Sequence, residues 1–161
     1  MKGVKMYKKP VVITGTVGED AHVIGTKILS MALREAGFEV IELGCMTPPE
    51  EFIKAALDHK ADAILMSSLY GMAELDVKDF RKRCDEAGLG DIILYIGGVL
   101  AVGKQDFEII EEKFKGFGFD RVYPPETEPE KAIEDLWYDL EARGKSKRNF
   151  GEREVKGEGR G

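Results

Sequence analysis

The chain of 161 residues contains few cysteines and no long apolar run. Cys45 and Cys84 lie far apart and have no CxxC or CxxH companion, so the sequence predicts neither a disulfide framework nor a zinc site, and both are interpreted as reduced structural thiols. No apolar run approaches the ~18 residues of a membrane-spanning helix, and no signal-peptide pattern follows the lysine-rich segment 1–9. We therefore expect a cytoplasmic protein with no membrane partner.

Phosphate-binding motifs and internal repeats are also missing. Neither Gly15-Thr16-Val17-Gly18 nor Gly97-Gly98 leads into Gly-Lys-Ser/Thr, so neither is a P-loop, and no dinucleotide fingerprint is present. Of the two histidines, His59 lies near the end of an expected helix without a metal-ligand partner at helical spacing. We expect His59 on the surface.

The net charge of −6 is unevenly distributed along the chain. Residues 1–9 and 143–161 are basic, so the body between them is strongly acidic, which argues against a nucleic-acid partner. The basic ends fit solvated termini or, alternatively, segments that dock on an acidic partner. Residues 144–161 hold five glycines among charged residues, so we expect a disordered tail after one domain at 1–143.

Apolar runs alternate with segments of helical period, a pattern typical of βα units in a parallel sheet. Five such units predict a flavodoxin-like (Rossmann-like), doubly wound α/β fold with strand order 2-1-3-4-5. The expected strands are Val11–Thr14, Glu39–Leu43, Ala63–Ser67, Ile92–Ile96 and Asp120–Tyr123. The expected helices are His22–Ala36, one that follows Thr47, Asp76–Ala87, Lys104–Lys115 and one from near Pro129.

The sequence also predicts which helical residues face the core, cap a helix or face solvent. The first helix is expected to end at a left-handed Gly37 and to face the core with five apolar residues: Ile24, Ile28, Met31, Ala32 and Leu33. Thr47 is expected to cap the second helix. The run Arg81-Lys82-Arg83 is interpreted as a solvated helix face.

Three short motifs follow the first, third and fourth expected strands. They are Asp20-Ala21-His22-Val23-Ile24-Gly25, Ser67-Ser68-Leu69 and Gly97-Gly98, which together give the pattern DxHxxG…SxL…GG. Because the carboxyl ends of parallel strands share one edge, we expect these motifs to converge near the switch point between the first and third strands.

Each motif has a functional and a structural interpretation. The positive end of a helix dipole keeps the His22 ring neutral and able to bind a metal, and Asp20 can accept the hydrogen bond of its other nitrogen. Alternatively, Asp20 caps the helix and His22 is a solvated loop residue.

Ser67 can donate to a heteroaromatic nitrogen beside an apolar wall at Leu69, or it satisfies strand-end backbone groups. The glycine pair allows close ligand approach, or forms a turn.

With these residues assembled, the chain resembles the cobalamin-binding small subunits of glutamate mutase (methylaspartate mutase) over about residues 10–140. Glu19 and Val99 depart from the family pattern, which bears on local loop contacts rather than on the cofactor. The resemblance extends to Gly25–Leu29, Ala61–Leu65, Tyr70-Gly71, Cys84–Leu89, Tyr95–Gly98 and Val102–Gln105.

This resemblance implies that adenosylcobalamin is the cofactor and that His22 is the lower axial ligand of its cobalt, supported by Asp20. The displaced dimethylbenzimidazole would lie inside the domain, where Ser67 bonds its nitrogen and Leu69 packs on its ring. The other cofactor-binding residues implied are Ala21, Val23, Gly25, Ser68, Gly97, Gly98, Val99 and Gly103.

The resemblance also implies a radical rearrangement of L-glutamate to threo-3-methylaspartate. No catalytic residue beyond His22 is expected in this chain. A substrate-binding TIM barrel needs about 250 residues, so it would have to be a separate subunit. A larger TIM-barrel subunit would bind L-glutamate and complete a heterotetramer. The alternatives are a corrinoid methyl carrier, which has a helical bundle before its cobalamin domain, and the small subunit of methylmalonyl-CoA mutase. A response-regulator receiver would need an aspartate where Met66-Ser67 stands.

Overall fold

The computed structural model describes residues 9–18, 24–68, 73–100 and 106–144. A five-stranded parallel sheet has the predicted order β2-β1-β3-β4-β5. The strands are β1 (Val11–Thr16), β2 (Glu39–Glu42), β3 (Ala63–Ser68), β4 (Ile93–Gly98) and β5 (Arg121–Tyr123). The helices are α1 (Ile24–Glu35), α2 (Pro49–His59), α3 (Ala73–Val77), α4 (Phe80–Glu86), α5 (Phe107–Gly116) and α6 (Pro129–Ala142).

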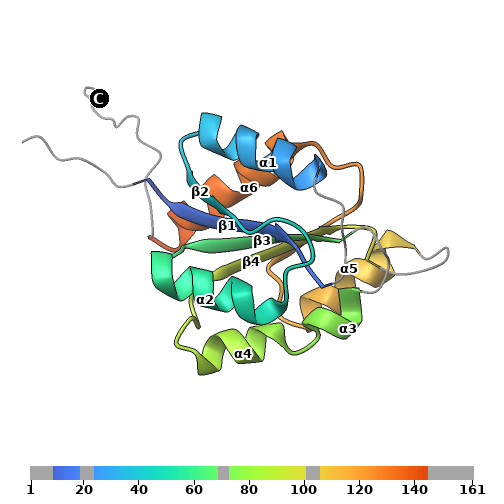
Figure 1. Ribbon diagram of the computed structural model, residues 1–161. Coiled ribbons are helices and arrows are strands. Elements are labelled where there is room, and N and C mark those ends of the chain that lie inside the picture. The colour runs from blue at the N-terminus through green and yellow to red at the C-terminus, as the bar shows by residue number, and fades with distance from the viewer. Residues whose placement is uncertain (1–8, 19–23, 69–72, 101–105, 145–161) are drawn as a thin grey trace, which may run out of the picture.

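Helices cover both faces of the sheet (Figure 1), with α1 and α6 on one face and α2, α3, α4 and α5 on the other. Alternate residues of each strand therefore enter different cores: Val12 packs with Leu33 of α1, and Ile13 packs with Phe52 of α2. This two-sided burial explains why the three central strands, β1, β3 and β4, begin with continuous apolar runs. None of the helices in the described part is long and apolar enough to cross a membrane.

The predicted core face of α1 is wrong in part: Leu33 is buried as predicted, but Ile28 and Met31 are not. Ile28 and Met31 are 53% and 59% exposed, whereas Leu33 and the hydroxyl residues Thr26 and Ser30 are buried against the sheet. The apolar period of the sequence was misleading because polar side chains occupy two of the buried positions. Those hydroxyls find partners on β1, so they are not left unsatisfied.

Two helix boundaries also differ from the prediction. Thr47 does not cap α2, because its hydroxyl donates to the carbonyls of Gly44 and Cys45 in its own turn, at 3.2 and 3.4 Å, and the helix starts at Pro49. The expected helix Asp76–Ala87 is two helices, α3 and α4, with a break at Asp79 (φ −112°, ψ 14°). Gly37 has the predicted left-handed conformation, with φ +103°.

The prediction that Arg81-Lys82-Arg83 forms a solvated helix face is wrong for Arg81. Its guanidinium donates to the carbonyls of Gly118 and Ile92, both at 3.0 Å, and to the Asp120 carboxylate at 3.1 Å. The same Asp120 carboxylate accepts the Leu94 N–H at 2.9 Å. One half-buried side chain of α4 therefore joins the start of β4 to the turn before β5.

We predict that Arg81→Gln lowers the free energy of unfolding by about 2–3 kcal/mol, because it removes charge-assisted hydrogen bonds to half-buried acceptors. Lys82→Gln is the matched control, since Lys82 is exposed beside it. Urea unfolding of both variants measures the difference. Equal stability of the two variants would contradict this role for Arg81.

A polar cluster links β4 and β5 to α6. Arg121 donates two hydrogen bonds to the Asp139 carboxylate, at 2.8 and 2.9 Å, and the Tyr95 hydroxyl donates to the same carboxylate. Tyr123 donates to Asp135 at 2.7 Å. Burial raises the pKa of both tyrosines, so each stays a neutral donor. Burial alone would raise the pKa of Asp139, but the bonds from Arg121 and Tyr95 hold it below its usual value.

We predict that Asp139→Asn destabilises the fold by about 2 kcal/mol at pH 7, because it removes a charged acceptor. A lowered carboxyl pKa stabilises the fold above the unfolded value of 3.8, and this stability is lost as pH falls through the lower folded pKa. The difference from the native chain should therefore shrink at acid pH in thermal unfolding. Asp58→Asn, at an exposed pair with Lys54, should change little at any pH. A pH-independent Asp139 effect would exclude the linkage.

Candidate functional site

The ends of β1, β3 and β4 lie side by side. Thr16 pairs with Ser67, Ser67 with Gly97, and Ser68 with Gly98. The structure thus brings the serine and glycine motifs together, next to the end of β1. Of the other expected site residues, Gly25 lies in the first turn of α1 and Val99 directly follows β4. Those outside the described residues are Asp20, Ala21, His22, Val23, Leu69 and Gly103.

Three hydroxyls meet between α1 and the sheet, and we call them the hydroxyl cluster: Thr16, Thr26 and Ser67. The Thr26 oxygen lies 2.9 Å from that of Thr16 and 2.9 Å from that of Ser67. The Thr16 and Ser67 oxygens are 3.4 Å apart. Thr16 and Thr26 are buried, whereas Ser67 is half-buried. Ser67 is therefore the member with access to the space beside the cluster.

Ser68 points to the opposite face of the sheet from Ser67, because successive strand residues alternate. Its hydroxyl is fully buried and has no hydrogen-bond partner in the part of the chain that the structure describes. Ser67 and Ser68 thus occupy different environments.

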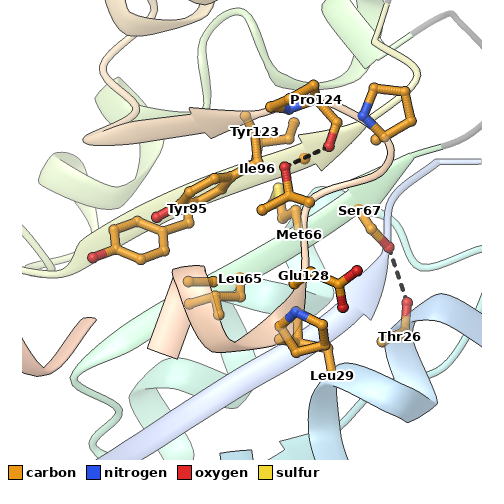
Figure 2. Close-up of a pocket in the computed structure, with 16 residues that line it drawn as sticks. Thr26, Leu29, Leu65, Met66, Ser67, Tyr95, Ile96, Tyr123, Pro124 and Glu128 are labelled. Carbon is orange, nitrogen blue, oxygen red and sulfur yellow. Dashed lines mark hydrogen bonds between the residues drawn. The ribbon is translucent and has the colours of Figure 1, made fainter. Parts of the chain in front are cut away.

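A pocket of about 190 Å³ opens beside Ser67, between the strand ends, α1 and α6. Its walls are mainly apolar and come from Leu29, Leu65, Tyr95, Tyr123 and the prolines that follow β5. Figure 2 shows Ser67 and Thr26 joined at one side of this space, with Tyr123 and Pro124 on another. A flat heteroaromatic group with one acceptor nitrogen suits such a pocket, because apolar walls and one hydroxyl match its surface.

The glycine pair has a structural role in this wall. A Cβ on Gly97 would lie 3.3 Å from the Tyr123 Cβ, so glycine at this position lets β5 pack closely. Gly98 has φ +108°, a conformation that glycine adopts without strain. Both residues also line the pocket.

Two parts of the site were not predicted from the sequence. One is the wall formed by Tyr123 and the segment 124–129, which carries no motif. The other is the pair Thr16 and Thr26. A signal existed for it, because Thr14 and Thr16 alternate in an apolar strand while Thr26 and Ser30 are four residues apart in α1.

The described residues show neither a metal-ligand cluster nor an activated thiol at the buried Cys84. They contain no group of three or more His, Cys, Asp or Glu side chains that could hold a metal ion. Burial raises the pKa of the Cys84 thiol to about 11, which keeps it protonated and unreactive. His59 is exposed, as predicted.

Comparison with solved structures shows the fold. A cobalamin-binding protein from Desulfitobacterium hafniense is similar with a TM-score of 0.66 and 22% identity, over 80% of this chain and 58% of that one. The signal receiver domain of a response regulator from Mycobacterium tuberculosis is similar with a TM-score of 0.62 and 15% identity, over 84% and 99%. The flavodoxin-like architecture is common to both kinds of protein, so it does not by itself decide between them.

Sequence comparison separates these possibilities. The family model of the B12 binding domain matches residues 10–134. The glutamate mutase sigma subunit of Clostridium cochlearium is 53% identical over 135 residues, which cover 84% of this chain and 98% of that protein. Sigma subunit 1 of Haloarcula marismortui is 51% identical over 84% of this chain and 89% of that protein. The methyl-carrier, methylmalonyl-CoA mutase and receiver alternatives are not favoured, and the chain belongs to the B12-binding domain family and, within it, to the glutamate mutase sigma subunits.

Proposed function

We propose that this chain is the cofactor-binding subunit of a glutamate mutase, and that it holds adenosylcobalamin at the carboxyl edge of its sheet. The observation that carries the proposal is the apolar pocket beside the Ser67 hydroxyl, in a chain about half identical to glutamate mutase sigma subunits. The pocket is the right kind of space for the cofactor's dimethylbenzimidazole, which has a flat ring and an acceptor nitrogen.

His22 is proposed as the lower axial ligand of the cobalt, and Asp20 as the acceptor of its second ring N–H. In the sequence, both residues fall between the end of β1 and the start of α1. The amino end of α1 disfavours a charged imidazolium, so a histidine there stays neutral and can coordinate a metal. A carboxylate partner fixes the ring tautomer and raises the basicity of the coordinating nitrogen.

The nucleotide end of the cofactor is proposed to enter the pocket. Ser67 would donate to the base nitrogen, while Leu29, Leu65 and Tyr123 would exclude water from the ring. The strand-end and loop residues near it are proposed to contact the same cofactor: Ala21, Val23, Gly25, Leu69, Gly97, Gly98, Val99 and Gly103. The sequence also offered Ser68, but its side chain is fully buried on the opposite face of the sheet and is not part of this proposal.

Adenosylcobalamin, when bound, supplies homolysis of its cobalt–carbon bond, which starts radical rearrangements. This chain's own task is to bind and orient the cofactor. Sigma-subunit relatives imply a separate catalytic subunit. We propose that this partner is a TIM barrel that binds L-glutamate over the exposed face of the cofactor, and that the product is threo-3-methylaspartate.

We predict that His22→Ala abolishes displacement of the cofactor's own base, because no imidazole replaces it. The absorption spectrum of bound cobalamin should lose the signature of a displaced base with histidine coordinated. His59→Ala, which changes the exposed histidine, should leave that spectrum as it is in the native chain. An unchanged spectrum for His22→Ala would refute the axial role.

We predict that Ser67→Ala weakens cobalamin binding by about 1 kcal/mol, the usual contribution of one hydrogen bond. Equilibrium titration measures the loss. Cobinamide, which lacks the nucleotide, provides the matched control because it cannot occupy the pocket, and its affinity should not change. Equal losses for the two corrinoids would argue against the pocket as the nucleotide site.

A further inference from the structure

We propose that Thr26 is a positioning residue that fixes Ser67 as a hydrogen-bond donor toward the pocket, with Thr16 as the next member of the same chain of hydroxyls. The inference rests on the proposed function, in which Ser67 meets an acceptor nitrogen.

The distances define the order of the chain. Thr26 bridges its two neighbours at 2.9 Å each, whereas Thr16 and Ser67 are separated by the longer 3.4 Å. Figure 2 shows the Thr26 to Ser67 bond at the side of the pocket. Each hydroxyl has one proton to donate and lone pairs to accept with. The bridging position therefore allows Thr26 to donate to one neighbour while it accepts from the other.

Proton counting then gives two arrangements. If Thr26 donates to Thr16, Ser67 must donate to Thr26, and it presents only lone pairs to the pocket. If Thr16 donates to Thr26 and Thr26 to Ser67, the Ser67 proton is not used by Thr26 and can be donated to the pocket, with the Thr16 oxygen at 3.4 Å as the weaker competing acceptor. An acceptor nitrogen can bind only the second arrangement. The cluster thus decides whether Ser67 offers a proton.

Burial strengthens the influence of Thr16 and Thr26 on the Ser67 proton. Thr16 is 0% exposed and Thr26 is 4% exposed, so water does not compete for their hydroxyls. Hydrogen bonds in a low-dielectric environment also polarise one another along a chain. A Ser67 that accepts from Thr26 is therefore a better donor than an isolated serine at the same strand end.

The molecule contains a matched pair for comparison. Thr14 of β1 and Ser30 of α1 form another buried hydroxyl contact, also 2.9 Å, between the same strand and the same helix. Neither residue lines the pocket. A purely structural role for Thr26 predicts that the two hydroxyl pairs behave alike, whereas a positioning role predicts that they differ in ligand binding.

The test compares the affinities of the full-length chain for cobalamin and cobinamide by equilibrium titration. Thr26→Val keeps the side-chain volume and removes the hydroxyl, and we expect it to weaken cobalamin binding about three- to tenfold while cobinamide binding is unchanged. Thr26→Ser, which restores the hydroxyl, should recover the native affinity. Thr16→Val leaves Ser67 its direct donor and should give a smaller loss in the same direction.

Ser30→Ala is the control. It should lower the thermal unfolding midpoint and leave both affinities unchanged. Native affinity for Thr26→Val, no recovery in Thr26→Ser, or equal losses with Ser30→Ala would overturn the positioning role. Should Thr26→Val not fold, the loss of cobalamin affinity in Thr16→Val, set against the unchanged affinity of Ser30→Ala, decides the matter. If the native chain itself binds cobinamide as tightly as cobalamin, the proposed nucleotide pocket fails, and the positioning role with it.

Discussion

The parallel pairing of β1 with β3 is the constraint on which the site depends. It sets Thr16 beside Ser67, and the next pairing sets Ser67 beside Gly97. A shift of one residue in either register would turn Ser67 to the opposite face, where Ser68 now lies. Parallel strands also need crossover helices, so the end of β1 is followed by α1, which carries Thr26. Sheet register thus determines the chemistry at this edge.

The pocket forms where the apolar packing between the sheet and its α1–α6 face ends. Leu33, Leu136 and Leu140 fill the deeper part of this layer, and they are fully buried. Nearer the strand ends, smaller hydroxyl side chains replace them on α1 and β1. In a polar layer of this kind each buried hydroxyl needs a hydrogen-bond partner. The resulting hydrogen bonds stabilise the packing and also fix which hydroxyl donates and which accepts. Because threonine and serine side chains are smaller than leucine, this end of the layer has room for a ligand.

The sequence predicted the strands, the sheet order and the convergence of the serine and glycine motifs. Strands are recognised from local apolar patterns, and general topology rules then give the order of the sheet and the edge where the strands end. The orientation of α1 could not be predicted, since Thr26 and Ser30 are buried only because β1 offers them hydroxyl partners. Arg81 was misjudged for a related reason. Its acceptors at Ile92 and Gly118 are backbone carbonyls, which a side-chain pattern does not show. The pocket wall after β5 likewise depends on tertiary packing.

The proposed coordination of cobalt by His22 is tested most directly by electron paramagnetic resonance of the cob(II)alamin complex, prepared with chain labelled with nitrogen-15 histidine. The axial nitrogen splits the signal, and the multiplicity of that splitting reports which isotope is bound. Coordination by His22 predicts a doublet with the labelled chain and a triplet with unlabelled chain. A triplet from both samples would show that the cofactor's own base remains on the metal, which contradicts the proposed binding mode.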